Sequence, residues 1–352
     1  MLRKMSRYGY YEMDIEKNNK TILADLSGKT VFITGATGLI GQNLVRTLVA
    51  SNNQRDNPTR IIALVRSLDR AKRVLKRDYS AIECVVGDVN KPIRLLESVD
   101  YIIHAASQTA SKSFVEHPVN TIETAITGTK NVLELAKEKK VKKFVYLSTM
   151  EVYGSPSSDE RIGECHATNL DPMQVRSCYP ESKRICENLC MAYMKEFGIP
   201  VNVVRLTQTF GLGVNYYDGR VFAEFARCVI ENRDIVLHTK GETKRSYLYT
   251  EDAVNAILTI LTEGDAGQAY NAANEDTYCS ICEMAQMVAE KFGGGKIKVR
   301  IEVEDENKFG FAPTLKMNLD TSKLRALGWK PEVGLEEAYR RMIRNMQEES
   351  TV

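Results

Sequence analysis

Short apolar runs rich in β-branched residues alternate with longer amphipathic stretches between residues 29 and 206. A strand buried on both faces is a continuous apolar run, whereas a covering helix repeats its apolar positions every three to four residues. The alternation therefore predicts βαβ units in a parallel sheet with helices on both faces. The predicted strands are Thr30–Thr34, Arg60–Arg66, Ile82–Val86, Tyr101–His104, Lys143–Ser148 and Val201–Leu206. The predicted helices among them are Leu39–Ala50, Thr121–Lys139 and Tyr179–Phe197.

The pattern becomes less regular after Leu206, where Gly, Asn, Asp and Tyr of Thr209–Gly219 indicate a loop. Helical stretches then alternate with short strands, at Val221–Asn232, Thr250–Thr262, Ser280–Phe292 and Gly334–Gln347. We predict a doubly wound α/β domain over residues 29–208 and a smaller α/β substrate domain over residues 209–352. The polar residues 1–28 are interpreted as a leader packed on the main domain.

The composition narrows the class of protein and of partner. The chain has 352 residues, of which 43% are hydrophobic and 27% charged, as in an ordinary globular protein. Its 48 Lys and Arg against 46 Asp and Glu leave a net charge of +2, without long blocks of like charge, so we expect no nucleic-acid partner. No apolar run approaches the roughly 20 residues that span a bilayer. The N-terminus also lacks the apolar core of a secretory signal, and we expect no membrane partner.

The eight cysteines are scattered through the predicted helices and strands. Cys186 and Cys190 stand one helical turn apart, and Cys279 and Cys282 form a lone C-x-x-C pair. Because no second ligand pair lies nearby in the sequence, reduced thiols are favoured over zinc ligands or a disulfide. The sequence therefore predicts a cytoplasmic protein without a metal site.

A glycine-rich loop follows the first predicted strand and opens the first predicted helix. Gly35 allows a tight turn, Gly38 lets backbone N–H groups approach a pyrophosphate, and Gly41 permits close packing of helix and strand. The helix N-terminus adds a partial positive charge. This context predicts a Rossmann-type dinucleotide site, whose loop residues are Gly35, Thr37, Gly38, Leu39, Ile40 and Gly41.

The end of the second strand bears on the choice between NAD and NADP. An acidic residue there binds the ribose 2′-hydroxyl of NAD, whereas an arginine accommodates the 2′-phosphate of NADP. The strand ends in Val65 and Arg66 with no carboxylate. The cofactor prediction is therefore NAD(P), with NADP slightly favoured over NAD. Asp88 and Val89, after the third strand, are expected beside the adenine, although a simple turn explains them as well.

Tyr179 and Lys183 are four residues apart and therefore lie on one face of a helix. A phenol with a pKa near 10 is a poor base at neutral pH, but an adjacent ammonium and a cationic nicotinamide favour phenolate. Thr149, at the carboxyl end of the fifth strand, is expected to hydrogen-bond the substrate hydroxyl that Tyr179 deprotonates. Glu151 is a candidate second acid or base, or a solvated loop carboxylate. His104 is interpreted as a core histidine rather than an acid.

The segments Thr34–Gly41, Asp100–Ala106, Ser148–Gly154 and Tyr179–Lys183, in this order, resemble the extended short-chain dehydrogenase/reductases that modify nucleotide sugars. The resemblance covers about residues 29–345. It implies a Thr149, Tyr179 and Lys183 triad, transient oxidation of a sugar at C4, and a homodimer formed through the two helices beside the catalytic strands. It also implies that segments of the C-terminal half can interweave with the first domain. The cofactor residues that it adds are Ala105, Ala106, Ser107 and Ser148, together with Tyr179 and Lys183. The nucleotide-sugar residues that it implies are Gln208, Arg220, Arg245 and Tyr249.

Within this family the chain is most similar to the UDP-glucuronate decarboxylases, through Arg176–Arg184, Gln208–Gly211 and Asp218–Val221. Met150 stands where the 4,6-dehydratases have an aspartic acid that donates a proton, which disfavours dehydration. Lys316, Ala125 and Gln208 depart from the decarboxylases: Lys316 replaces an arginine, whose fork suits a carboxylate, and the other two replace asparagines.

The expected function is therefore 4-epimerisation or decarboxylation of a nucleotide-diphosphate sugar, with UDP as the favoured nucleotide. A net NADPH-dependent reductase or dehydrogenase is the alternative, since NADP serves net reduction more often. A non-catalytic NADP-binding scaffold is the third hypothesis, which the intact Thr149, Tyr179 and Lys183 set disfavours.

Overall fold

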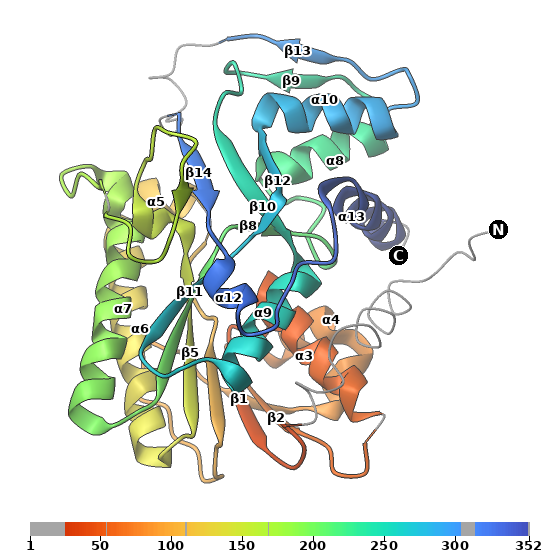
Figure 1. Ribbon diagram of the computed structural model, residues 1–352. Coiled ribbons are helices and arrows are strands. Elements are labelled where there is room, and N and C mark those ends of the chain that lie inside the picture. Colours follow the sequence, from red (N-terminus) through yellow and green to blue (C-terminus); the bar gives the residue numbers. More distant parts are fainter. Residues whose placement is uncertain (1–24, 54, 110, 168, 304–313, 351–352) are drawn as a thin grey trace.

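A seven-stranded parallel sheet forms the base of the molecule (Figure 1). The computed structural model describes residues 25–53, 55–109, 111–167, 169–303 and 314–350. The strand order is β11-β7-β5-β4-β1-β2-β3, so the chain winds outward from β1 in one direction and then from β4 in the other. The two halves meet between β1 and β4, and ligands of open α/β sheets bind at the carboxyl ends of the strands at such a point. The strands are β1 (Thr30–Thr34), β2 (Arg60–Val65), β3 (Glu83–Val86), β4 (Tyr101–His104), β5 (Lys143–Thr149), β7 (Val201–Leu206) and β11 (Gln268–Ala272).

Helices cover both faces of this sheet (Figure 1). Along β1, Val31 and Ile33 pack with the helices of one face, whereas Phe32 packs with those of the other. Successive side chains of a pleated strand point to opposite faces of the sheet, and here both faces are apolar, as the continuous apolar runs predicted. The first face is covered by α3 (Leu39–Asn52), α4 (Leu68–Leu75) and α9 (Thr250–Glu263), and the second by α6 (Pro118–Lys139) and α7 (Cys178–Phe197).

The residues at the ends of these helices explain where each helix begins or ends. Pro118 stands at the first position of α6, where its missing N–H costs no helical hydrogen bond. Helix α7 ends at Gly198, whose φ of 72° places it in the left-handed region that favours glycine. The short helix α5 (Ser111–Glu116) precedes α6.

A second layer stands on the carboxyl edge of the sheet (Figure 1). Its five-stranded sheet has the order β12-β10-β14-β6, with β8 paired to β10. Its own core is formed mainly by three helices packed on this sheet, and it includes Phe210, Phe222 and Tyr339. The strands are β6 (Arg161–Ile162), β8 (Gln208–Phe210), β10 (Lys244–Tyr249), β12 (Asn274–Ser280), β14 (Lys316–Leu319) and the separate pair β9 (Ile235–Leu237) and β13 (Val299–Ile301). The helices are α8 (Val221–Glu231), α10 (Ile281–Phe292), α12 (Ser322–Arg325) and α13 (Leu335–Ser350).

The predicted doubly wound parallel sheet is confirmed, and its six predicted strands lie within one residue of the observed bounds. The seventh strand, β11, and helix α9 come from the part of the chain after residue 208 and complete the first sheet and its cover. The division into two domains therefore stays a proposal in which these elements interweave with the first. Of the predicted leader, residues 1–24 lie outside the described residues. Among the helices that the structure describes, none is long and apolar enough to span a membrane.

Candidate active site

The glycine-rich loop lies at the point where the two halves of the sheet meet. Gly35 has a φ of +71°, and a Cβ atom on it would lie 2.7 Å from the backbone of Ala105 and Ala106. A Cβ on Gly41 would lie 2.1 Å from the carbonyl oxygen of Gly35. Both positions therefore exclude a side chain, because the loop folds tightly onto the end of β4 and onto the first turn of α3.

The N-terminus of α3 is open to an anionic ligand. Gly38 caps the helix in an extended conformation, is exposed, and makes no side-chain cap hydrogen bond. The amides of the first helical turn have no acceptor within the helix and carry the positive end of its dipole. Thr37, Leu39 and Ile40 flank this turn and are half-buried. The loop and the helix end therefore fit the diphosphate of a dinucleotide.

The other predicted cofactor residues follow the carboxyl ends of neighbouring strands. Arg66 is exposed directly after β2. Asp88 accepts a hydrogen bond from the amide of Asn90, and the carbonyl of Val89 accepts one from Asn131 at 2.7 Å. Ala105, Ala106 and Ser107 follow β4 beside Gly35. The structure thus gathers these residues along one edge of the sheet, and their contact with a cofactor stays a prediction.

Tyr179 and Lys183 lie in the first turns of α7, and both are buried. The Lys183 ammonium donates a hydrogen bond to the carbonyl of Leu147 in β5 at 2.7 Å, and its nitrogen lies 6.0 Å from the centre of the Tyr179 ring. Burial lowers the pKa of Lys183 from 10.5 to about 8. The side chain therefore keeps its charge at neutral pH within reach of the phenol.

Thr149, at the end of β5, hydrogen-bonds the Tyr179 hydroxyl. Burial raises the pKa of Tyr179, and the negative charge of Glu151 raises it further. The Thr149 hydrogen bond and the charges of Arg176 and Arg220 act in the opposite direction. The phenol is protonated without ligands, and its ionisation depends on the cations arranged around it.

Sequence reasoning missed two features beside this tyrosine. The Phe114 ring of α5 stacks on the Tyr179 ring, with 4.3 Å between centroids and 11° between planes. Arg176, just before α7, pairs with Glu151 at 2.9 Å, and its guanidinium carbon lies 5.0 Å from the centre of the Phe114 ring. Arg176 stood inside a segment that carried the family resemblance. Phe114 stood in a stretch for which no helix was predicted.

The predicted nucleotide-sugar residues have different surroundings. Arg220 is held by Asp218 through two guanidinium nitrogens, at 2.9 and 2.6 Å. Arg245, on β10, has a buried Nε without a hydrogen-bond partner within the protein, which suits a guanidinium that binds an anion. Gln208 lies on β8 next to β10 and is half-buried. Tyr249 is 1% exposed in the core of the second layer, and its contact with a substrate stays a prediction.

Met150 and Lys316, two positions that depart from the family patterns in the sequence analysis, both contact other side chains of this chain. Met150 is buried in a small apolar cluster with Met317 and Leu319, and its sulfur accepts a hydrogen bond from Thr207 at 3.3 Å. The Lys316 ammonium donates to Asp159 at 2.6 Å. An apolar, packed Met150 offers no proton to a substrate.

His104 is the core histidine that the sequence predicted. It is 2% exposed, with Nδ1 2.7 Å from the Thr34 hydroxyl and Nε2 3.3 Å from the Thr129 hydroxyl. Burial, with the charge of Lys183 as a smaller contribution, lowers its pKa from 6.5 to about 3. His104 is therefore neutral at physiological pH.

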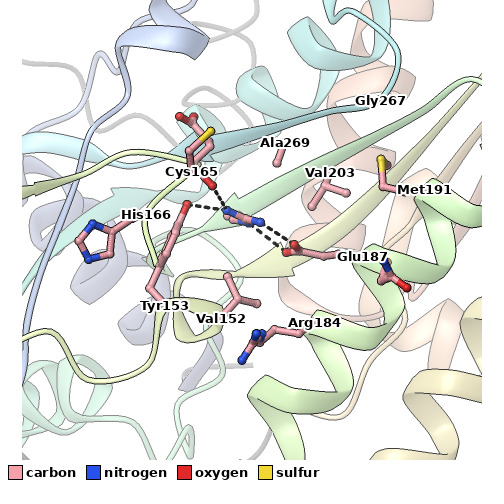
Figure 2. Close-up of a pocket in the computed structure, with 13 residues that line it drawn as sticks. Val152, Tyr153, Cys165, His166, Arg184, Glu187, Met191, Val203, Gly267 and Ala269 are labelled. Carbon is pink, nitrogen blue, oxygen red and sulfur yellow. Dashed lines mark hydrogen bonds and ion pairs between the residues drawn. The ribbon is translucent and has the colours of Figure 1, made fainter. Parts of the chain in front are cut away.

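A pocket of about 410 Å³ lies beside α7, and neither Tyr179 nor Lys183 lines it (Figure 2). Tyr153 and Glu187 point toward one guanidinium there, that of Arg205, which donates to the Tyr153 hydroxyl at 2.8 Å and to Glu187 at 2.7 Å (Figure 2). Glu187 also accepts a hydrogen bond from Ser148 at 2.5 Å. The ion pair thus links α7 to β7, and the Ser148 hydrogen bond links α7 to β5, the strand that ends in Thr149. The cofactor contact expected of Ser148 stays a prediction.

Residues 31–273 match the model of the NAD dependent epimerase/dehydratase family. UDP-glucuronic acid decarboxylase 6 of Arabidopsis thaliana is 31% identical over 314 residues, which cover 88% of this chain and 87% of the relative.

Two solved structures bear on the fold alone, because their identity is low. The UDP-glucose 4-epimerase of Thermotoga maritima, solved with UDP-glucose, superposes with a TM-score of 0.78 at 21% identity, covering 91% of this chain and 99% of that one. The dTDP-glucose 4,6-dehydratase DesIV of Streptomyces venezuelae, solved with NAD, superposes with a TM-score of 0.76 at 23% identity, covering 92% of this chain and 98% of that one.

Proposed function

The chain belongs to the NAD dependent epimerase/dehydratase family and is an enzyme, and on this premise we propose that it modifies a nucleotide-diphosphate sugar, with UDP as the nucleotide, through transient oxidation at C4. The observation that carries the proposal is the grouping of Thr149, Tyr179 and Lys183 beside the glycine-rich loop. Residues 29–208 would hold the dinucleotide, residues 209–352 the nucleotide sugar, and residues 1–28 would form a leader.

Tyr179 is the proposed base that takes the proton of the C4 hydroxyl. Thr149 hydrogen-bonds the phenol and can orient the same sugar hydroxyl. The buried charge of Lys183 and the nearby Arg176 and Arg220 favour the phenolate that this step needs. When bound, NAD(P) supplies the hydride acceptor and later returns the hydride. Phe114 covers the ring of the base and keeps water from that face.

Glu151 is the proposed second acid or base on the sugar carbons. A C4 ketone activates the neighbouring C5, so a C6 carboxylate can leave C5 as carbon dioxide, and Glu151 is the proposed donor of the proton that C5 then gains. Alternatively, the unchanged ketosugar can be reduced from its other face. These two outcomes are the decarboxylase and the 4-epimerase hypotheses. Dehydration stays disfavoured, because Met150 is packed among apolar side chains.

We propose that NADP is slightly preferred over NAD. Arg66 is exposed at the carboxyl end of β2, where a 2′-phosphate of a dinucleotide would lie, and the guanidinium suits phosphate oxygens. The same observation favours the second candidate function, a reductase or dehydrogenase that consumes one nicotinamide cofactor per turnover.

We also propose a homodimer formed through α6 and α7. Both helices lie side by side on one outer face of the sheet and expose large apolar side chains, among them Val119 and Ile122 of α6 and Ile185 of α7 (Figure 1). Exposed apolar groups on adjacent helices are typical of a protein interface.

Mass spectrometry of co-purified nucleotides, followed by incubation with a panel of nucleotide sugars, tests the function. An isomeric product supports the epimerase, and loss of carbon dioxide supports the decarboxylase. Stoichiometric loss of reduced cofactor absorbance would instead support the reductase. Tyr179→Phe should lower turnover about a hundred- to ten-thousand-fold while dinucleotide affinity stays within about two-fold. Retained turnover in this variant would exclude the mechanism.

A further inference from the structure

The ion pair between Arg176 and Glu151 lies beside the proposed base. The carboxylate and the guanidinium are 2.9 Å apart, and their side chains are 31% and 38% exposed. Both charges act on the Tyr179 phenol, Glu151 by raising its pKa and Arg176 by lowering it. The pair is therefore partly exposed to solvent beside the proposed base rather than buried in the protein interior.

This pair engages the Glu151 carboxylate. Glu151 is the side chain proposed to act on the sugar carbons, and an arginine on its carboxylate limits its freedom to do so. An ion pair of this exposure is weak, because water and salt screen it. An incoming anion can therefore replace Glu151 on the guanidinium.

Arg220, another cation near the site, is held more firmly. Its guanidinium donates three hydrogen bonds to Asp218, at 2.9, 3.2 and 2.6 Å. In the part of the chain that the structure describes, Glu151 is the carboxylate that pairs with Arg176, through a single contact. A guanidinium matches the two oxygens of a carboxylate better than it matches one.

We propose that Arg176 is a specificity residue that exchanges Glu151 for the C6 carboxylate of a nucleotide-diphosphate hexuronate. The proposal rests on the proposed function. Arg176 binds Glu151 in the free enzyme, binds the sugar carboxylate in the complex, and releases Glu151 to act on the sugar carbons. No covalent bond changes in this exchange, and the two carboxylates compete for one guanidinium.

Calorimetry on the full chain with UDP-glucuronate, UDP-glucose and UDP tests the exchange without any turnover. Arg176→Gln should weaken UDP-glucuronate binding about ten- to hundred-fold. The affinities of this variant for UDP-glucose and UDP should change less than about two-fold. Glu151→Gln removes the internal competitor and should tighten UDP-glucuronate binding about two- to five-fold, the opposite sign. Arg184→Gln is the matched control, since Arg184 is a half-exposed arginine paired with Glu181 on α7.

Three results would overturn the exchange. Arg176→Gln could leave UDP-glucuronate binding unchanged, could weaken all three ligands equally, or Glu151→Gln could weaken UDP-glucuronate binding. If Arg176→Gln does not fold, the sign of the Glu151→Gln effect still decides. A wild-type chain that binds UDP and UDP-glucose but does not prefer UDP-glucuronate contradicts this inference alone. A chain that binds none of the three contradicts the proposed function as well.

Discussion

The phenyl ring of Phe114 lies parallel to the phenol ring of Tyr179, 4.3 Å from it. Cys178, the residue before the tyrosine, donates a weak hydrogen bond from its thiol to the carbonyl of Phe114 at 3.3 Å. The short helix α5 is thereby attached to the start of α7 through both a ring and a backbone contact. This attachment defines the orientation of the proposed base, because the ring of Tyr179 cannot rotate without displacing Phe114.

Phe114→Ala should reduce both stability and turnover. Phe114 is 2% exposed, and removal of a buried phenyl ring costs about 3 kcal/mol in the free energy of unfolding. The freed phenol ring should also lower kcat more than it raises KM. Phe114→Leu, which fills most of the volume but cannot stack, should recover most of the stability and little of the turnover. Urea unfolding and steady-state kinetics check both values, and an unaltered kcat in Phe114→Ala would refute the positioning role.

The stability of the cofactor-free protein should depend on pH through Lys183. Because the pKa of Lys183 is lowered from 10.5 to about 8, the native state loses this proton first as the pH rises. Between about pH 8 and 10.5 the unfolded state binds more protons, so the free energy of unfolding rises with pH. In Lys183→Met this contribution is absent.

The free energy of unfolding of wild type minus that of Lys183→Met should therefore increase by about 2 kcal/mol from pH 8 to pH 10. Urea unfolding at several pH values measures the difference. Lys195→Met is the control, because Lys195 is an exposed lysine of the same helix and should give no such trend. A difference that stays constant with pH would contradict the burial of a charged Lys183.

The elements that the sequence predicted well are those whose cause is local. The strands around Val31 and Ile103 are apolar on both faces, and α7 stops at a glycine in the left-handed region. The order of the motifs along the chain also located Thr149, Tyr179 and Lys183, since parallel strands bring their carboxyl ends to one edge.

What the sequence did not predict depends on contacts between distant segments. Strand β11, at the edge of the sheet, has two half-buried residues before Tyr270, so its apolar run is too short to indicate a buried strand, and pairing with β7 decides its place. The Phe114 stack joins residues that are far apart in the chain, and nothing in the spacing of either one indicates it. The pair of Glu151 and Arg176 likewise follows from the loop between β5 and α7, which has no periodic pattern.

Arg66→Gln should shift the choice of dinucleotide. If the exposed Arg66 binds the 2′-phosphate, its loss should weaken NADP binding about ten- to hundred-fold and leave NAD binding within about two-fold. Arg60→Gln is the matched control, because Arg60 is an exposed arginine at the opposite end of β2. Fluorescence titration with both dinucleotides measures the affinities. Equal affinities for NADP in wild type and Arg66→Gln would exclude Arg66 as the selecting residue.

Charged residues on α6 should dissociate the proposed homodimer. Val119 and Ile122 are three residues apart and therefore share one face of α6, and they are 66% and 38% exposed. In a two-fold interface each substitution enters twice, so two carboxylates per chain place four like charges in a desolvated region. The double variant Val119→Asp, Ile122→Asp should therefore be monomeric by light scattering at concentrations where wild type is dimeric.

Leu96→Asp is the control for this dimer test, because Leu96 is a fully exposed leucine outside α6 and α7. It should leave the mass of the wild-type species unchanged. Circular dichroism should show that the double variant keeps its helix content, since both substituted side chains face outward in the monomer. A dimer that persists in the double variant would place the interface elsewhere, and a monomeric wild type would exclude the dimer. The turnover of a folded monomer would then show whether the site of one chain needs the other, since Tyr179 and Lys183 lie on the α7 side of the same interface.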